Sequence, residues 1–468
     1  MTVVAKEDSA IVGADGQTGV VAAMQRAPLD SWLTLALLFF FCILANFDQR
    51  IMVMLVEPIK ADFKLTDVQM AWLLGPAFAV AFSLFQIPLG WASDKYPRRL
   101  VIYLGVTAWS LATMACAFTN SFWALLFARA FVGVGEASLG PAAYSLIVDK
   151  FPRRRLSLAL SIYSFALKIG TAIAMGLGGV IIAVAAILAL RKLPLLDRME
   201  PWQMVFIMVG GVGIVVALLA LAIHEPARPA RTKAHDDDLK ASRGFGDFLK
   251  ENIKLVATLG AAFGLTYMTV GALLSWVPTY MTRHYGWTPI QYGPVMGLMS
   301  FISVGILFAK GLAVDWLFVR GWKDIYVRFY TWLLVCSIPL VPIAFIQQNP
   351  VVFLVLLGVI QSVALGAPMF LAITSQSISP THLRGRMSAS LLVVTGLMTG
   401  VGPLLPAAIT DLVFKDESRI GSSMCIVATV ALVLALILFR VSLRWVGPII
   451  IKHAIDPAAA QAGGGAHH

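Results

Sequence analysis

The chain has 468 residues, of which 59% are hydrophobic and only 13% are charged, and its formal net charge is +11 at pH 7. Soluble domains carry about a quarter charged residues, so this composition excludes an ordinary soluble enzyme and indicates a membrane protein. The basic excess does not indicate nucleic-acid binding, because most Lys and Arg lie in short connectors between apolar runs, where they set membrane orientation.

The two ends of the chain are read as tails. Residues 1–30 are polar and lack the apolar core of a secretory signal, so we expect a cytoplasmic N-terminal tail. Residues 447–468 are expected to form a C-terminal tail that ends in AGGGAHH, which resembles a linker and tag remnant. His467 and His468 are therefore left out of any site.

Twelve apolar runs are long enough to cross a bilayer, which takes about 20 residues. They cover residues 31–53, 68–92, 100–119, 121–148, 156–187, 202–224, 252–281, 290–316, 326–346, 350–376, 385–413 and 421–446. The fifth run is so long that tilt or an extension beyond the membrane must absorb its excess. The sequence therefore predicts an all-α integral membrane protein with 12 transmembrane helices.

Basic residues collect in the connectors on one side of the predicted helices. After spans 2, 4, 8 and 10 come Lys95, Arg98, Arg99, Lys150, Arg153, Arg154, Arg155, Arg320, Lys323, Arg384 and Arg386. Connectors on the other side are uncharged or balanced, as in the segment that holds Glu57, Lys60, Asp62, Lys64 and Asp67. The positive-inside rule therefore predicts cytoplasmic termini, in a bacterial inner membrane.

A polar stretch and two repeated motifs divide the chain into halves. Residues 226–251 form the only long polar connector, so we expect a cytoplasmic linker between bundles at 31–225 and 252–446. GWASDKYPRR (90–99) and GLAVDWLFVR (311–320) share the pattern G-x-x-x-D-x4-R, and RRRLSLAL (from 153) matches RGRMSASL (from 384). Such repetition predicts two pseudo-symmetric six-helix bundles, a transporter architecture.

Several motifs resemble those of the major facilitator superfamily, over all twelve spans. GWASDKYPRR is similar to the signature loop between helices 2 and 3, with Pro97 where glycine is usual, and Arg129-Ala-Phe-Val-Gly133-Val-Gly135 is similar to the helix-4 motif. Bacterial Spinster-like transporters are the nearest resemblance, carried by Asn46-Phe47-Asp48, Gly133-Val-Gly135-Glu136-Ala137 and Trp276-Val-Pro278. The resemblance implies alternating access and lysolipid or sphingoid-type substrates.

The chain departs from the Spinster-like pattern in helix 1. Asp48-Gln49-Arg50 replaces the usual Asp-Arg, which turns the arginine about 100° around the helix, so its family role does not transfer to Arg50. Lys168 in helix 5 is also outside the pattern.

Charged side chains inside the predicted helices are the strongest site candidates, because a charge at mid-bilayer costs a few kcal/mol or more. Arg129 and Glu136 are seven residues apart and share a helix face. Asp48 lies at about the depth of Arg129, which favours a pairing between them. Glu136 and Lys168 lie 16 residues before and after Pro152, so a Glu136–Lys168 ion pair is a second expectation.

The buried positions of these charged residues suggest a role for each of them in transport. Because burial disfavours a charged carboxylate, we expect Glu136 first and Asp48 second to exchange the coupling proton. The expected substrate-binding residues are Arg129, Lys168, Arg50, Asn46, Tyr267, Trp276 and Gln361, and the further polar cavity candidates are Thr266, Ser275 and Thr395. The alternatives are structural: Arg129 could bond backbone groups, Glu136 could be permanently paired, and Lys168 could be a charge partner.

The repeated loops are expected to carry a gate made by Gly90, Asp94, Arg98, Arg99 and Asp315. Asp94 could approach a helix N-terminus of the other half, where the helix dipole favours a carboxylate. Arg98 and Arg99 could add cross-half contacts, or could serve membrane topology alone.

No enzyme signal competes with transport. The sequence shows no phosphate-binding loop, no nucleophile with a base in register and no metal spacing, and Cys42, Cys116, Cys336 and Cys425 are isolated in apolar segments. GVGEAS lies inside a membrane helix, which fails the context that a nucleotide-binding loop needs. We therefore predict no catalytic site, no metal site and no cofactor apart from H⁺ as the coupling ion.

The predicted function is secondary active transport of an amphipathic or anionic small molecule by a monomer. Uptake of a sugar acid or another small organic anion is the alternative within transport. A non-transporting lipid-binding receptor is the alternative of another class. The substrate, the direction of transport and the choice between H⁺ and Na⁺ stay open.

Overall fold

The computed structural model describes residues 28–190, 199–226, 245–322, 325–379 and 383–462, and all regular elements in these ranges are helical. The N-terminal bundle consists of α2 (Leu29–Met54), α3 (Val56–Phe63), α4 (Asp67–Leu74), α5 (Pro76–Lys95), α6 (Arg98–Cys116), α7 (Phe122–Glu136), α8 (Leu139–Lys150), α9 (Arg153–Leu190), α10 (Pro201–Ala217) and η1 (Leu218–Ala222). The C-terminal bundle consists of α12 (Ile253–Tyr285), α13 (Pro289–Val319), α14 (Ile325–Ser337), α15 (Leu340–Phe345), α16 (Pro350–Leu365), α17 (Ala367–Ile378), α18 (Arg384–Val401), α19 (Leu404–Ala408), η3 (Ile409–Phe414), η4 (Glu417–Arg419) and α20 (Ile420–Ala462).

The predicted architecture, an all-α membrane protein with twelve membrane-crossing segments, is confirmed. Within the described residues, eleven helical segments are long and apolar enough to cross a membrane, and Pro350–Val363 adds a shorter apolar helix. That helix and α17 together occupy the tenth predicted span, which is interrupted at Gly366. Most of the predicted linker lies outside the described residues, although residues 245–250 are helical.

Prolines explain why several predicted spans appear as two helices. A proline lacks the N–H that would bond the carbonyl four residues earlier, and its ring crowds that carbonyl. Pro76 begins α5 after the break at Gly75, and Pro141 lies four residues after Ala137, where α7 gives way to α8. The interruptions therefore follow from local sequence.

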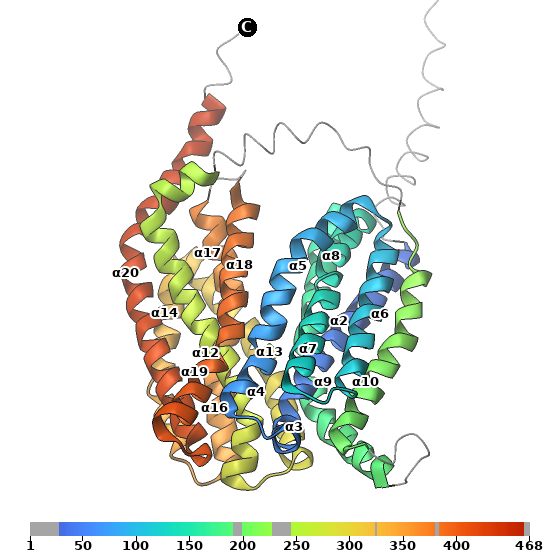
Figure 1. Cartoon of the computed structure of the whole chain (residues 1–468). Coiled ribbons are helices and arrows are strands. Elements are labelled where there is room, and N and C mark those ends of the chain that lie inside the picture. Colours follow the sequence, from blue (N-terminus) through green and yellow to red (C-terminus); the bar gives the residue numbers. More distant parts are fainter. Residues whose placement is uncertain (1–27, 191–198, 227–244, 323–324, 380–382, 463–468) are drawn as a thin grey trace, which may run out of the picture.

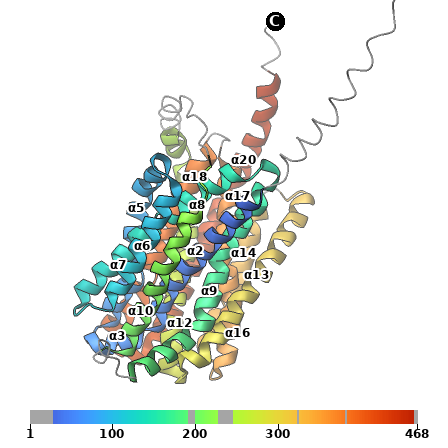
Figure 2. The ribbon, with the colours of Figure 1, turned by 90° about the vertical axis from the view of Figure 1, so that its right-hand side faces the viewer.

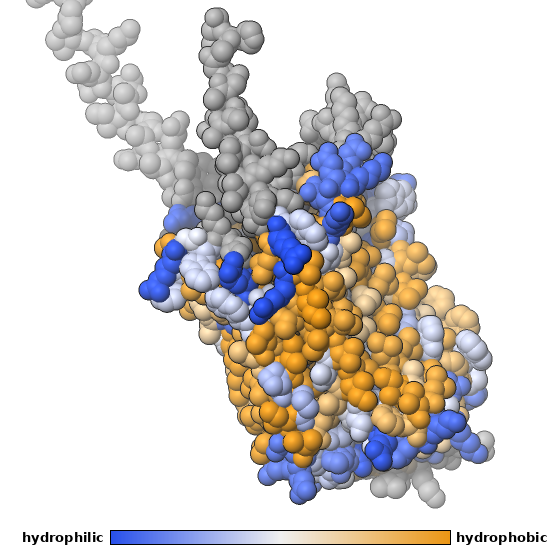
Figure 3. Space-filling view, turned by 90° about the vertical axis from the view of Figure 1, so that its left-hand side faces the viewer, coloured by the Kyte–Doolittle hydropathy of each residue, from blue (hydrophilic) through white to orange (hydrophobic). Residues whose placement is uncertain are grey.

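The exterior carries an apolar band with polar residues at both ends (Figure 3). Its exposed apolar side chains include Leu84, Ile87, Leu312 and Val430, each more than half exposed. Large apolar side chains left outside a packed core are stable when lipid, rather than water, surrounds them. The band thus fits a multi-pass membrane protein.

The two ends of the molecule differ (Figure 1). We call the end where α2 begins and α8 ends the terminal end. The opposite end, which holds α3, α4 and the start of α13, is called the far end. The ribbons of the two bundles converge toward the far end and separate toward the terminal end (Figure 1).

Glycines bring the bundles together in the far half of the molecule. The long helix α9 packs along α13 of the other bundle (Figure 2). A Cβ on Gly297 would lie 2.8 Å from the carbonyl oxygen of Ala172, and one on Gly179 would lie 2.4 Å from that of Pro289. A second contact joins α5 to α18, where a Cβ on Gly400 would lie 2.3 Å from the side chain of Ala79. Only glycine permits helices to approach this closely.

Candidate functional site

A buried ion pair lies inside the N-terminal bundle. Arg129 on α7 and Asp48 on α2 are each 2% exposed, and Arg129 Nη1 lies 3.6 Å from Asp48 Oδ1. The structure thus confirms the predicted pairing of these two residues. At 3.6 Å the contact is an ion pair but too long for a hydrogen bond.

The hydrogen bonding of this pair is incomplete. Thr113 Oγ1 on α6 donates to Asp48 Oδ2 at 2.5 Å. Asp48 Oδ1 and the Nε and Nη1 atoms of Arg129 are buried without a hydrogen-bond partner among the described residues. Because unpaired buried polar atoms are costly, this pair is poised to gain a partner.

Glu136 lies two helical turns from Arg129 on α7 and is 3% exposed. Gln49 Nε2 donates to Glu136 Oε2 at 2.6 Å, while Glu136 Oε1 is buried and has no hydrogen-bond partner within the described segments. Asp48 and Arg129 both lie within electrostatic range of this carboxyl. A buried acid with one neutral donor is well suited to hold a proton.

The predicted Glu136–Lys168 ion pair is wrong for this structure. Glu136 bonds Gln49, and Lys168 is not within ion-pair distance of a carboxylate in the described part of the chain. The reason is the order of packing: α9 packs along α2, whereas α7 packs on α5 and α6. Equal depth on helices that are not neighbours does not produce contact.

The other residues expected at the substrate site fall into two groups. Asn46 donates to the Cys42 carbonyl of its own helix at 2.9 Å, and Trp276 Nε1 donates to the Pro403 carbonyl at 2.8 Å. Both side chains therefore have structural bonds. Tyr267 is partly buried, and Gln361 Nε2 is buried with no hydrogen-bond partner in the part of the chain that the structure describes. Gln361 can therefore still donate a hydrogen bond to a substrate.

Two of the three further polar candidates of the C-terminal bundle bond their own helices. Thr266 Oγ1 donates to the Ala262 carbonyl at 3.0 Å, and Thr395 Oγ1 donates to the Leu391 carbonyl at 2.9 Å. Ser275 is buried at 5% exposure. Lys310, a buried cation that the sequence analysis missed, donates to the Ser362 carbonyl at 2.5 Å. In the sequence, Lys310 is a single lysine within an apolar run, and this pattern could have identified it as a buried cation.

Among the predicted gate residues, Arg98 is bonded inside one bundle. Its side chain contacts Asp149, Ser145 at 2.8 Å and Glu225 at 2.8 Å, all in the N-terminal half. The cross-half contact expected of Arg98 is therefore not formed in this structure. Burial alone would raise the pKa of the Glu225 carboxyl, but hydrogen bonds from Arg98 and from the Arg99 backbone N–H outweigh it and lower that pKa.

The remaining gate candidates lie at the terminal end. Asp94 and Asp315 are exposed, and Gly90 faces Pro141, whose side chain would lie 3.8 Å from an added Cβ. The structure leaves their proposed gating role untested.

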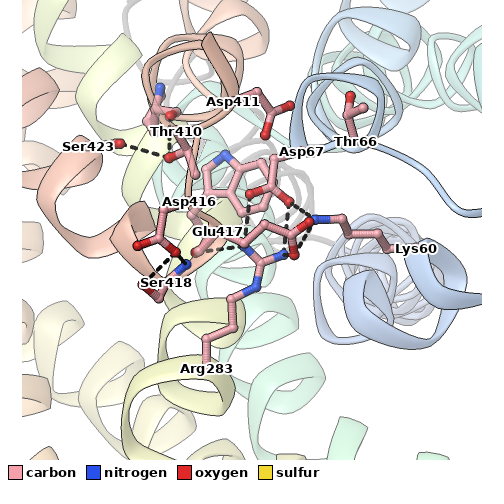
Figure 4. Close-up of polar contacts among 12 residues, drawn as sticks. Lys60, Thr66, Asp67, Arg283, Thr410, Asp411, Asp416, Glu417, Ser418 and Ser423 are labelled. Atoms are coloured by element: carbon pink, nitrogen blue, oxygen red, sulfur yellow. Dashed lines mark hydrogen bonds and ion pairs between the residues drawn. The ribbon is translucent and has the colours of Figure 1, made fainter. Parts of the chain in front are cut away.

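A second charged cluster, missed by the sequence analysis, joins the two bundles at the far end (Figure 4). We call it the far-end network, and it consists of Glu57, Lys60, Asp67, Arg283 and Glu417. Arg283 on α12 donates through both Nη atoms to the two Asp67 oxygens at 2.8 Å and through Nε to Glu57 at 2.8 Å. Lys60 bonds Asp67 at 2.5 Å and Glu417 at 2.8 Å.

The far-end network closes the boundary between the bundles. Asp67 is fully buried and receives donors from both bundles. Nearby, the Asp411 carboxylate accepts from the backbone N–H of Val68, in the first turn of α4, at 2.8 Å. A carboxylate at a helix N-terminus is stabilised by the helix dipole. The sequence showed Glu57, Lys60 and Asp67 only as part of a balanced connector. Their partners in the other bundle, Arg283 and Glu417, lie more than 200 residues further along the chain.

No group of three or more potential metal ligands occurs among the residues that the structure describes.

Comparisons with known proteins agree with this geometry. The family model of the Major Facilitator Superfamily matches residues 35–403. Protein spinster homolog 1 of Xenopus tropicalis is 28% identical over 290 residues, which cover 60% of this chain and 52% of that protein. The chain thus matches about half the length of this relative.

Two further relatives are bacterial. The D-galactonate transporter of Escherichia coli O6:H1 is 26% identical over 318 residues, covering 64% of this chain and 70% of that protein. An MFS-type efflux pump of Mycolicibacterium smegmatis is 25% identical over 446 residues, covering 92% and 96%. Among solved structures, a bacterial homolog of the human lysosomal transporter Spinster, inward-facing and unoccupied, matches with a TM-score of 0.73 and 21% identity, covering 92% of this chain and 99% of that one.

Proposed function

Since the chain belongs to the Major Facilitator Superfamily and is a membrane transporter rather than an enzyme, we propose that it is a Spinster-like, proton-coupled transporter of an amphipathic or anionic small molecule. The proposed substrate class is lysolipid or sphingoid-like, and the proposed mechanism is alternating access between the two bundles. We further propose that the protein works as a monomer in a bacterial inner membrane, with cytoplasmic termini. The basic connectors at the terminal end support this orientation.

The observation that carries proton coupling is the half-satisfied Glu136 carboxyl. It is 3% exposed, accepts a hydrogen bond from the neutral Gln49 amide alone among the described residues, and lies in electrostatic range of the Asp48–Arg129 pair. When the site is sealed, burial favours the protonated acid; when water reaches it, the proton can leave. Arg129, with two buried unpaired nitrogens, is placed to stabilise whichever of the two carboxylates is charged.

The far-end network supports alternating access. It joins the bundles through ion pairs, which can separate without breaking a covalent link or a hydrophobic core. Because the proposed orientation puts the termini in the cytoplasm, the far-end network lies on the outer side of the membrane and closes the space between the bundles there. Asp94 is proposed to form the corresponding contact at the terminal end in the opposite state, with Gly90, Arg98, Arg99 and Asp315 around it.

The test is flux in proteoliposomes under an imposed pH gradient, with lysophosphatidylcholine as the first probe. We expect the wild type to accumulate the probe when a pH gradient is imposed. In Glu136→Gln, we expect uptake of the probe to be the same with and without the gradient. Glu251→Gln, which removes an exposed carboxyl outside the bundle interior, is the matched control and should behave as the wild type. Unchanged pH dependence in Glu136→Gln contradicts the proposal.

A second candidate substrate class is a sugar acid or another small organic anion. The similarity to the D-galactonate transporter favours it, as do the cations inside the N-terminal bundle. A thermal-shift comparison of lysophosphatidylcholine with D-galactonate separates the two classes, since only a bound substrate raises the melting temperature.

A further inference from the structure

A cavity of about 240 Å³ lies between the two bundles at the far end, where their ribbons converge (Figure 1). Its walls come from the end of α2, from α3, α9 and α12, and from the start of α13. Glu57 of the far-end network lines it, so the cavity lies directly beside the ion pairs that join the bundles. A molecule held there would contact both bundles at once.

Water is a poor occupant of this cavity. The volume would hold roughly eight water molecules at about 30 Å³ each, and an ordered water needs about two to four polar partners. Most of the lining is apolar, with Val53, Met54 and Ile182 in its walls. Thr282, one of the few polar lining residues, donates its hydroxyl to the Pro278 carbonyl of its own helix at 3.2 Å. The lining therefore favours an apolar body over water.

The hydroxyl of Thr279, which also lines the cavity, lacks a partner. Thr279 on α12 is 1% exposed, and its Oγ1 is buried without a hydrogen-bond partner among the described residues. Other threonines of the same helix differ, because the hydroxyls of Thr269 and Thr282 bond carbonyls four residues earlier. A buried hydroxyl without a partner is costly. A ligand that bonds Thr279 would recover part of that cost.

The charge in the lining is already balanced. Arg283 Nε donates to Glu57 Oε1 at 2.8 Å, so the carboxylate at the cavity has a counter-ion. A charged ligand head would lose its hydration without gaining a free counter-charge, which is unfavourable. The site therefore favours a ligand with an uncharged head.

The cavity volume sets the size of the ligand. An engineered cavity of about 150 Å³ binds benzene, so by proportion about 240 Å³ accommodates roughly ten non-hydrogen atoms. Met54 can adjust to the exact shape, because a methionine side chain is flexible. It lies between α9 and α13, beside Gly178 and Gly293.

We propose that this cavity is an inhibitory site for an uncharged apolar alcohol of roughly ten non-hydrogen atoms, whose hydroxyl bonds Thr279. Because the ligand contacts both bundles, it binds while the far end is closed and stabilises that state. A molecule that stabilises one of two alternating states slows transport. This inference rests on the proposed alternating access and adds a ligand that inhibits it.

The binding test uses four probes with the same ring: 4-isopropylcyclohexanol, isopropylcyclohexane, 4-isopropylcyclohexylamine and 4-isopropylcyclohexanecarboxylate. Each is titrated against the wild-type protein in lipid nanodiscs at about pH 7, where the amine and the carboxylate are charged. Empty nanodiscs give the baseline for partition into lipid. We expect the alcohol to bind about tenfold or more tighter than the amine and the carboxylate.

Substitutions locate the binding. Thr279→Val removes the hydroxyl at nearly constant volume, so it should weaken the alcohol about threefold to tenfold, as expected for one hydrogen bond, and leave isopropylcyclohexane unchanged. Thr279→Ser should keep the wild-type affinity. Thr269→Val is the matched control, because this buried threonine of the same helix already bonds the Leu265 carbonyl at 3.1 Å. Val53→Phe fills the cavity and should prevent binding of the alcohol and of isopropylcyclohexane. Melting temperatures show that each variant is folded.

The inhibitory role is tested by exchange of labelled for unlabelled substrate in proteoliposomes. The alcohol should slow exchange by the wild type over the concentration range in which it binds. Thr279→Val should need about threefold to tenfold more alcohol for the same inhibition. Arg283→Gln, which loosens the closed far end without altering Thr279, should also weaken binding of the alcohol.

Three binding results would overturn the inference: no alcohol binding above the empty-nanodisc baseline, tighter binding of the amine or the carboxylate than of the alcohol, or unchanged alcohol affinity in Thr279→Val. Binding that leaves exchange unaltered would contradict the inhibitory role. A wild type that binds the alcohol as expected but exchanges no substrate would contradict the proposed function instead, so the two proposals fail separately.

Discussion

Arg283 at the far end is partly buried and Arg129 inside the N-terminal bundle is fully buried, and both lie beside carboxylates, yet their bonding is opposite. Arg283 uses Nε and both Nη atoms on Glu57 and Asp67 of the other bundle, and it also bonds Glu417 of its own bundle. Among the described residues, the one ion pair of Arg129 is with Asp48 of its own bundle, at 3.6 Å, and two of its nitrogens are buried without a hydrogen-bond partner.

The difference separates a structural role from an exchanging one. A saturated arginine between two bodies holds them in one arrangement, because separation leaves buried charges unpaired. An unsaturated arginine beside two acids can change partners at little cost. We therefore assign conformational holding to the far-end network and charge exchange to the Asp48–Arg129–Glu136 cluster.

The largest expected effect is on stability, from Arg129→Gln. It leaves the buried Asp48 carboxylate with Thr113 alone, and an uncompensated buried charge costs about 3–5 kcal/mol. The double variant Arg129→Gln/Asp48→Asn should recover most of this loss, because no charge then remains unpaired. Chemical denaturation of the two variants measures the effect. An unstable double variant would mean that Arg129 acts through packing rather than charge.

An intermediate effect is expected on accessibility, with opposite signs at the two ends. Arg283→Gln removes the bonds that join Asp67 to α12, so a membrane-impermeant maleimide should label a Thr279→Cys reporter about tenfold faster. Thr279 is 1% exposed and lies beside the far-end network. Asp94→Ala should slow this labelling, because it weakens the proposed terminal-end contact of the opposite state.

The matched control is Arg419→Gln, which removes an exposed arginine of the same far end whose Nε lies 3.8 Å from Asp416. It should leave the labelling rate unchanged. Equal rates in Arg283→Gln and Arg419→Gln would remove the holding role from the network, and faster labelling in Asp94→Ala would contradict the gate. The assay uses a background without Cys42, Cys116, Cys336 and Cys425.

The smallest expected effect comes from Glu225→Gln at the terminal end. The folded-state pKa of Glu225 is lowered, so its contribution is present above the unfolded pKa of about 4.3 and is lost as pH falls through the folded value. The variant should lose about 0.5–1 kcal/mol at neutral pH, and the gap to the wild type should close in acid. Denaturation at pH values on either side of this range measures the gap. A gap that widens in acid would contradict the assignment.

The sequence predicted the membrane-crossing helices and one of the two buried ion pairs that we expected inside the N-terminal bundle, but not the other. Hydrophobic run lengths predicted the twelve spans, and counting residues along the helices predicted that Asp48 and Arg129 would meet. The same counting failed for Glu136 and Lys168, because it gives depth but not which helices are neighbours. Arg98 was expected across the bundles but bonds Glu225 and Asp149, since a nearby acid in its own half satisfies it.

The far-end network was beyond prediction for a different reason. The contacts that join its two bundles pair charges in connectors or at helix ends more than 200 residues apart, where many pairings satisfy charge balance equally well. Only the packing of α9 against α13 and of α5 against α18 selects one of them.

The measurement that tests the account most directly compares two transport modes of Glu136→Gln in the same proteoliposomes. A neutral glutamine mimics the permanently protonated acid, so exchange of labelled for unlabelled substrate should continue while accumulation driven by a pH gradient is lost. The account predicts near wild-type exchange with accumulation reduced about a hundredfold or to background, which corresponds to a loss of about 2.7 kcal/mol of coupling. Accumulation and exchange that fall together, or accumulation that survives, would contradict the claim that Glu136 carries the coupled proton.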